Sequence, residues 1–167
     1  MAVTKDQLLW EFGTPDPHQP LNAGVGATVQ LYRGTIAGLT GTGANAGYLK
    51  NMDTPASTDV VIGMINKGGP GYPDTIPGIL GGATNGAVTA EILTGTFLLA
   101  SGTGADQLSV ATAGSNVYVI NSITVGATSG GGTRPLAGVQ MPAGDLTNLP
   151  VGVGGLYPIK FTVVGSP

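Results

Sequence analysis

The chain has 167 residues, of which 41% are hydrophobic and only 9% are charged, and its formal net charge is −3. This composition excludes general disorder, because disordered chains combine low hydrophobicity with high net charge. The six basic residues are spread singly, so no run of positive charge indicates a nucleic acid partner, and we expect none. The absence of cysteine excludes disulfide bonds, thiolate catalysis and cysteine-bound zinc. So weakly charged a surface indicates that partners cover part of it, and we expect an oligomer or a lattice component.

Residues 1–22 are expected to form an extended N-terminal arm. The segment contains three prolines, the only tryptophan and the only histidine, and prolines bias the residues before them towards extended backbone. Its apolar residues, which we expect to dock on this domain or on a neighbouring protein, are Leu8, Leu9, Trp10 and Phe12. Charges interrupt the place where a secretion signal would be apolar, and no apolar run approaches membrane-spanning length. We therefore expect a soluble, unprocessed chain without a membrane partner.

From residue 23 to residue 167 the pattern predicts a single all-β domain. Short runs rich in valine, isoleucine, threonine and aromatic residues alternate with glycine-rich turns. The expected strands cover residues 27–38, 59–65, 86–93, 95–100, 116–120, 123–127, 136–141 and 157–164.

The turn formers add three local predictions. The dipeptide Asn85-Gly86 predicts a tight hairpin turn between strands near Ile79 and Val88, because both residues tolerate positive φ. Residues 67–82 are rich in glycine and proline and are interpreted as a long surface loop. Only residues 106–113 resemble a helical turn, which flanking glycines confine to a short piece.

The residues that could carry chemistry form no recognisable motif. The single histidine, His18, cannot supply a histidine-based metal site, and no G-x-S-x-G sequence indicates a serine nucleophile. Four carboxylates could pair after folding, as glycosidases require, but their spacing gives this no support: Asp53, Asp59, Glu91 and Asp106. The glycine clusters lack the lysine of a phosphate-binding loop. We expect no catalytic residue, no metal and no cofactor, and interpret the chain as non-enzymatic.

The stretch from residue 95 to residue 139 contains an ordered set of features. A G-x-F strand is followed by an aspartate-containing turn, a G-x-x-VYV strand, a TV pair and a Gly/Thr-rich link into an AGV strand. These features lie at Gly95 and Phe97, Asp106, Gly114 with Val117 to Val119, Thr124 with Val125, and Ala137 to Val139. In this order they resemble the small β-rich decoration proteins that tailed bacteriophages encode beside the major capsid protein. The resemblance is clearest over residues 86–164.

The resemblance implies a fold, a partner and a location. It implies a compact β-barrel-like or β-tulip-like domain on the outer surface of the capsid of the virion, often as a homotrimer at local three-fold positions. There such a protein bridges neighbouring subunits of the major capsid protein and stabilises the mature head. An apolar arm suits docking or strand addition to the shell, so the stretch from Leu8 to Phe12 is the candidate capsid-contact arm.

Two other interpretations stay open. The chain could be a phage surface adhesin or a fibre-associated carbohydrate-binding domain, in which Tyr48, Tyr72 or Tyr157 stacks on a sugar ring. A hydrolase whose carboxylates meet only after folding is the third interpretation, and it requires a concave site.

Overall fold

The computed structural model describes residues 3–4, 6–7, 20–142 and 155–162, and β-strands dominate its regular structure. Five strands form a sheet in the order β1-β7-β5-β3-β4, five form a closed barrel in the order β10-β8-β12-β11-β9, and β2 pairs with β6.

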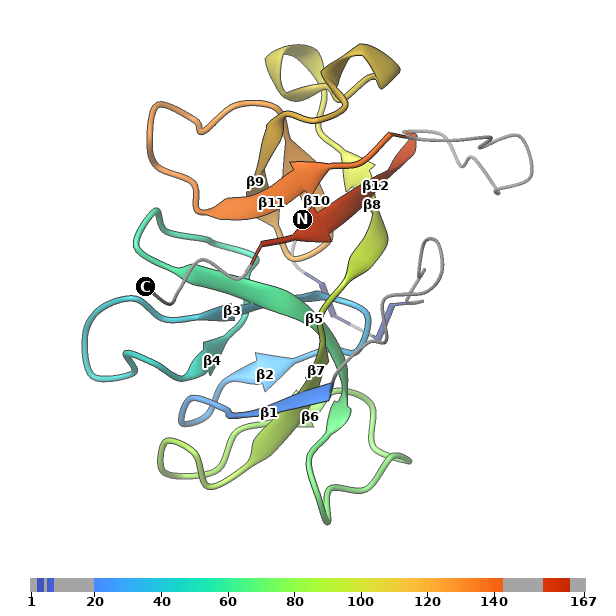
Figure 1. Ribbon diagram of the computed structural model, residues 1–167. Helices are drawn as coiled ribbons and strands as arrows, with labels where there is room; N and C mark the ends of the chain where they lie inside the picture. The colour runs from blue at the N-terminus through green and yellow to red at the C-terminus, as the bar shows by residue number, and fades with distance from the viewer. Residues whose placement is uncertain (1–2, 5, 8–19, 143–154, 163–167) are drawn as a thin grey trace.

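The sheet contains β1 (Pro20–Gly24), β3 (Ile36–Leu39), β4 (Leu49–Lys50), β5 (Val60–Gly68) and β7 (Thr89–Leu93). The barrel contains β8 (Thr96–Ser101), β9 (Asn116–Asn121), β10 (Thr124–Gly126), β11 (Leu136–Gln140) and β12 (Leu156–Phe161). The remaining elements are β2 (Gln30–Leu31), β6 (Ile79–Leu80) and two 3-10 turns, η1 (Gly104–Asp106) and η2 (Val110–Thr112). The expected all-β, barrel-containing domain is confirmed, and Figure 1 shows the barrel above the five-stranded sheet.

The five-stranded sheet curls until the residue that follows β1 meets β4, the strand at the opposite edge. Its neighbouring strands run antiparallel and join segments that are far apart in the sequence, such as Pro20 in β1 and Leu93 in β7. Just beyond β1, Val25 forms a parallel bridge with Leu49 of β4, and the Gly26 amide donates to the Leu49 carbonyl at 2.9 Å. This contact joins the two edges that an open sheet would leave apart.

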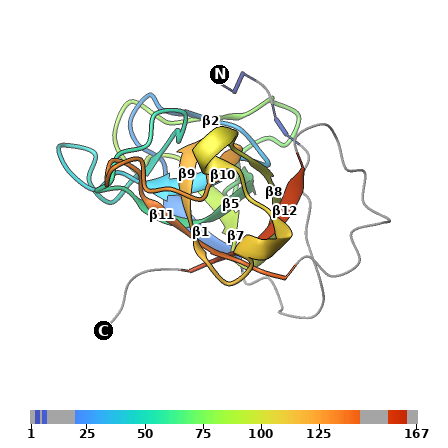
Figure 2. The same cartoon turned by 90° about the horizontal axis from the view of Figure 1, so that it is seen from above.

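The closed barrel is built from the C-terminal part of the chain, and Figure 2 shows it from above. Four of its strand pairs are antiparallel, and one parallel pair, β10 beside β8, closes the ring. Its interior is filled by apolar side chains, among them Phe97 and Phe161, whose ring centroids are 5.9 Å apart. A barrel this small encloses no channel, because even about eight strands leave an interior that side chains fill.

Strand β5 forms a wall shared by two apolar cores. Val61 and Met64 pack in the same cluster as Phe97 of the barrel, whereas Ile62 and Ile65 belong to a second cluster within the five-stranded sheet. An irregularity in the pairing of β5 with β3 lets positions 61 and 64 share one face. Because side chains of a strand point to both faces, a strand without polar residues at these positions can line two cores.

The prediction of a hairpin turn at Asn85-Gly86 is wrong. Ile79 lies in β6, which pairs with β2, whereas β7 pairs with β1 and β5. Gly86 has a φ of +75°, but Asn85 is not among the residues with positive φ, and a type I′ turn needs both. The Asn85 side chain instead accepts a hydrogen bond from the Ala27 amide at 2.7 Å and donates one to the Ala44 carbonyl at 3.1 Å. The Asn85 side chain thereby connects its own loop to the loops that contain Ala27 and Ala44.

The start of the chain is docked on the body of the protein. Asp6 accepts hydrogen bonds from the Arg33 amide at 2.8 Å, the Arg33 guanidinium at 3.0 Å and the Gly78 amide at 3.2 Å. The Gln7 amide donates to the Arg33 carbonyl at 2.7 Å, and β1, which begins at Pro20 inside the expected arm, pairs with β7. The residues outside the described ranges include Leu8, Leu9, Trp10, Phe12 and His18. The chain is therefore held on both sides of the apolar stretch.

Candidate functional site

Three polar side chains stand side by side across the five-stranded sheet. Asn22 of β1 lies opposite Glu91 of β7, and Glu91 lies opposite Lys67 near the end of β5. Directly opposite residues of antiparallel strands carry their side chains on the same face, about 5 Å apart. The strand register therefore gathers an amide, a carboxylate and an ammonium group from three distant segments of the sequence.

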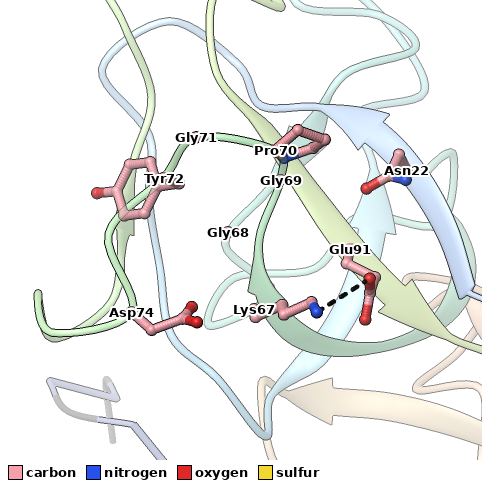
Figure 3. A pocket seen from close by; sticks show the side chains of 9 residues that line it. All are labelled: Asn22, Lys67, Gly68, Gly69, Pro70, Gly71, Tyr72, Asp74 and Glu91. Carbon is pink, nitrogen blue, oxygen red and sulfur yellow. Dashed lines mark ion pairs between the residues drawn. The ribbon is translucent and has the colours of Figure 1, made fainter.

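The loop after β5 turns this row into a hollow, which we call the polar recess. It has a volume of about 270 Å³ and is lined by Asn22, Lys67, Gly68, Gly69, Pro70, Gly71, Tyr72, Asp74 and Glu91. The Tyr72 hydroxyl points away from Lys67 and Glu91, as Figure 3 shows, and accepts a hydrogen bond from the Leu80 amide at 2.9 Å. The Tyr72 ring lies so close to Gly68 that no side chain fits at that glycine. Tyr72 is thus a fixed wall of the recess.

Glu91 is the most enclosed charged group of the polar recess. Its side chain is 17% exposed, its Oε1 accepts a hydrogen bond from the Asn66 amide group at 2.6 Å, and its Oε2 lies 3.6 Å from the Lys67 ammonium. Asp74, at the rim, is 73% exposed and lies 3.6 Å from an Arg33 guanidinium nitrogen. The recess therefore presents two carboxylates and one ammonium group, which together offer both hydrogen-bond acceptors and donors.

Ion pairs within the chain neutralise most of its described charges. Basic side chains in the described ranges pair with carboxylates: Arg33 with Asp6 and Asp74, Lys50 with Asp59, Lys67 with Glu91, and Arg134 with Asp106. Another carboxylate, that of Asp53, accepts a hydrogen bond from the Val3 amide at 3.1 Å. The surface accordingly carries fewer uncompensated charges than the composition alone indicates.

The four carboxylates singled out in the sequence each engage a different partner. Asp53 binds a backbone amide near the start of the chain, and Asp59 and Asp106 pair with a lysine and an arginine from other elements. Only Glu91 belongs to the polar recess. Among the residues that the structure describes, no three histidine, cysteine, aspartate or glutamate side chains are grouped so that they could hold a metal ion.

Asp106 fixes the connection between β10 and β11. It accepts hydrogen bonds from the Arg134 guanidinium at 2.7 Å and from the Thr128 hydroxyl. The hydrogen bond from Arg134, followed by the one from Thr128, lowers the pKa of Asp106 below its usual value of 3.8.

We expect the stabilising contribution of Asp106 to disappear in acid. A carboxyl group with a lowered pKa stabilises the fold above its unfolded pKa of about 4, and the contribution is lost as the pH falls through the folded pKa. Asp106→Asn should lower the free energy of unfolding at neutral pH by about 0.5–1 kcal/mol, and the difference from the parent should shrink below pH of about 4. Urea unfolding at a series of pH values measures this. A difference that is constant down to a pH of about 2 would contradict it.

The three tyrosines considered for sugar stacking lie in different places. Only Tyr72 lines the polar recess. Tyr48 lies over Gly24 and Gly86, and Tyr157 packs against the barrel core. Tyr157 also borders a second hollow of about 300 Å³ beside the barrel. The polar side chains of the recess that sequence reasoning did not single out are those of Asn22, Lys67 and Asp74.

The chain matches none of the known proteins with which it was compared: no family model, no curated protein and no solved structure. In the part of the chain that the structure describes, no helix is both long enough and apolar enough to span a membrane.

Proposed function

We propose that the protein is a non-enzymatic structural protein of a phage virion that binds the outer surface of the capsid and stabilises the mature head. Its partner is the major capsid protein, whose neighbouring subunits it bridges, and the expected form is a homotrimer. The resemblance of residues 95–139 to decoration proteins supports this function. In the fold, these residues form β8 to β11, which are four of the five strands of the closed barrel.

The observation that carries the proposal is the internal pairing of charges. Many identical copies pack densely on a shell only when they do not repel one another. The described cations are largely paired within the chain, whereas large apolar side chains remain on the surface: Leu21, Val60, Ile76, Leu80 and Val110. A surface of this kind binds through apolar contacts and hydrogen bonds rather than through attraction between opposite charges.

The stretch from Leu8 to Phe12 is the proposed capsid contact. Its own structure lies outside the described residues, but Gln7 before it and Pro20 after it are held by backbone pairing. Fixed flanks reduce the conformational entropy that a segment loses when it docks on a partner. A copy that contacts several subunits at once binds the shell more tightly than any one of its contacts would allow.

Binding to isolated heads that lack the protein tests this function. Added protein should bind to saturation, form a regular array on the outer surface in electron micrographs and raise the temperature at which heads release DNA. Occupancy should change by less than about twofold between about 0.1 and 1 M salt, because paired charges leave little for salt to screen. An absence of binding, or binding that is lost as salt rises, would contradict the proposal.

Variants locate the contact. Trp10→Ala combined with Phe12→Ala should weaken head binding by about tenfold or more, because buried aromatic anchors carry much of the energy of an interface. Val110→Ala, which removes exposed apolar surface from η2, is the comparison variant and should weaken binding far less, because one exposed valine contributes less than two aromatic anchors. Unfolding curves check that both variants fold. If Val110→Ala alone weakens binding, the contact lies at η2 and not in the arm.

A further inference from the structure

We propose that the polar recess binds one neutral sugar unit of a glycan. The proposal goes beyond capsid stabilisation and does not depend on it. The groups that would contact the sugar are Asn22 and Glu91 on neighbouring strands, Lys67 at the end of β5, and Asp74 at the rim. Tyr72 supplies the fixed wall described above.

The charges of the recess favour a neutral ligand that is rich in hydroxyl groups. In Figure 3 the Lys67 ammonium points toward Glu91, and the Asp74 carboxylate lies on the other side of Lys67. Each carboxylate already lies near a cation, Glu91 near Lys67 and Asp74 near Arg33, so the recess has no excess charge that would attract an anion such as phosphate or a cation. A sugar hydroxyl can donate to a carboxylate and accept from an ammonium or amide group at the same time.

The backbone of Asn22 and Glu91 and the Glu91 carboxylate are held in position before any ligand arrives. Glu91 and Asn22 stand on paired strands, and the hydrogen bond from Asn66 orients the Glu91 carboxylate. The distance of 3.6 Å between Lys67 and Glu91 is longer than a hydrogen bond, so both groups keep bonding capacity for a ligand. A site on rigid elements loses little entropy when it binds.

The size and lining of the recess fit a single sugar ring. Its volume of about 270 Å³ lies just below the range of about 300–1,000 Å³ that holds drug-sized molecules. Pro70 and Tyr72 provide the larger apolar groups of the lining, and a carbon placed at the Cβ position of Gly71 would meet no atom within 4 Å, so a ring can approach the loop closely there. A peptide would require apolar wells for its side chains, and this polar lining does not supply them.

Titration of isotope-labelled protein with glucose, galactose, mannose and N-acetylglucosamine, followed by amide chemical shifts, tests the site. We expect shifts centred on the amides of Asn22, Glu91, residues 67–69, Gly71 and Tyr72, with millimolar affinity for at least one sugar, because a single small ring makes few contacts. Glu91→Gln removes the charge and keeps the acceptor for Asn66, while Asn22→Ala removes an exposed amide. Each should weaken binding by about tenfold, which corresponds to about 1.4 kcal/mol.

Three controls make the result decisive. Lys160→Met removes an exposed lysine from the barrel and should leave the sugar affinity unchanged. Inorganic phosphate and ethylammonium should cause no shifts in the recess. Shifts with either ion, no shifts with any of the four sugars at tens of millimolar, or equal affinity of the parent and both recess variants would overturn the proposal.

Discussion

Phe97→Ala is expected to lower the free energy of unfolding by about 3–5 kcal/mol. Phe97 is fully buried in β8, beside Phe161 and in the same cluster as Met64 of β5. Loss of the ring removes contacts within the barrel and also between the barrel and the five-stranded sheet. Each barrel strand is paired on both sides, so the strands cannot close the cavity without breaking hydrogen bonds.

Urea unfolding followed by circular dichroism measures this loss. Leu80→Ala, which truncates a side chain that is 52% exposed, is the control and should change stability by no more than about 0.5 kcal/mol. We expect one cooperative transition for the parent and for both variants, because the two halves share the cluster around β5. A loss below about 1 kcal/mol for Phe97→Ala would contradict the packing described here.

Gly138→Ala is expected to lower the free energy of unfolding by about 3 kcal/mol, the upper end of the range for overpacking. Gly138 lies in β11 between β9 and β12, opposite Val117 on one side and Phe161 on the other. A methyl group there would lie 2.1 Å from the Lys160 carbonyl oxygen and 3.0 Å from the Phe161 α-carbon. Both are backbone atoms of a closed barrel, so no side-chain rotation relieves the clash.

Gly131→Ala separates this clash from the general effect of losing a glycine. Gly131 has a φ of +71° and nothing within 4 Å of the added carbon, so its cost is backbone strain alone. That strain amounts to about 1–2 kcal/mol. Thermal unfolding of the two variants should therefore rank Gly138→Ala as the less stable, and the reverse order would show that β11 can move away from β12.

Sequence patterns were informative where a strand is long and apolar. The run around Val61 to Ile65 predicted a strand, because a short run of apolar, β-branched residues between turn formers is typical of a strand that is buried on both faces. Strand β4 was not predicted, since two residues show no periodicity. A strand near Ile79 was predicted, but its partner is β2 and not the segment near Val88. Strand β1 lies in the proline-rich segment, and Pro20 is its first residue, where a strand tolerates a missing amide.

The polar recess could be predicted only in part. Tyr72 and Glu91 were singled out as an aromatic residue in a glycine-rich loop and as one of the few carboxylates. Asn22 and Lys67 were not, because they reach Glu91 only through the register of β1 and β5 against β7. The Asn85 side chain shows the same limit, since its bonds to two distant loops override a strong local turn signal.

The bridge between Val25 and Leu49 has a consequence for crowded conditions. Exposed strand edges offer free amides and carbonyls on which further copies can grow into fibrils. Here one bridge and one backbone hydrogen bond join the two ends of the five-stranded sheet, and the barrel has no edge at all. A chain built in this way can accumulate at high local concentration and keep its copies separate, so that they meet through side chains instead of through shared sheets.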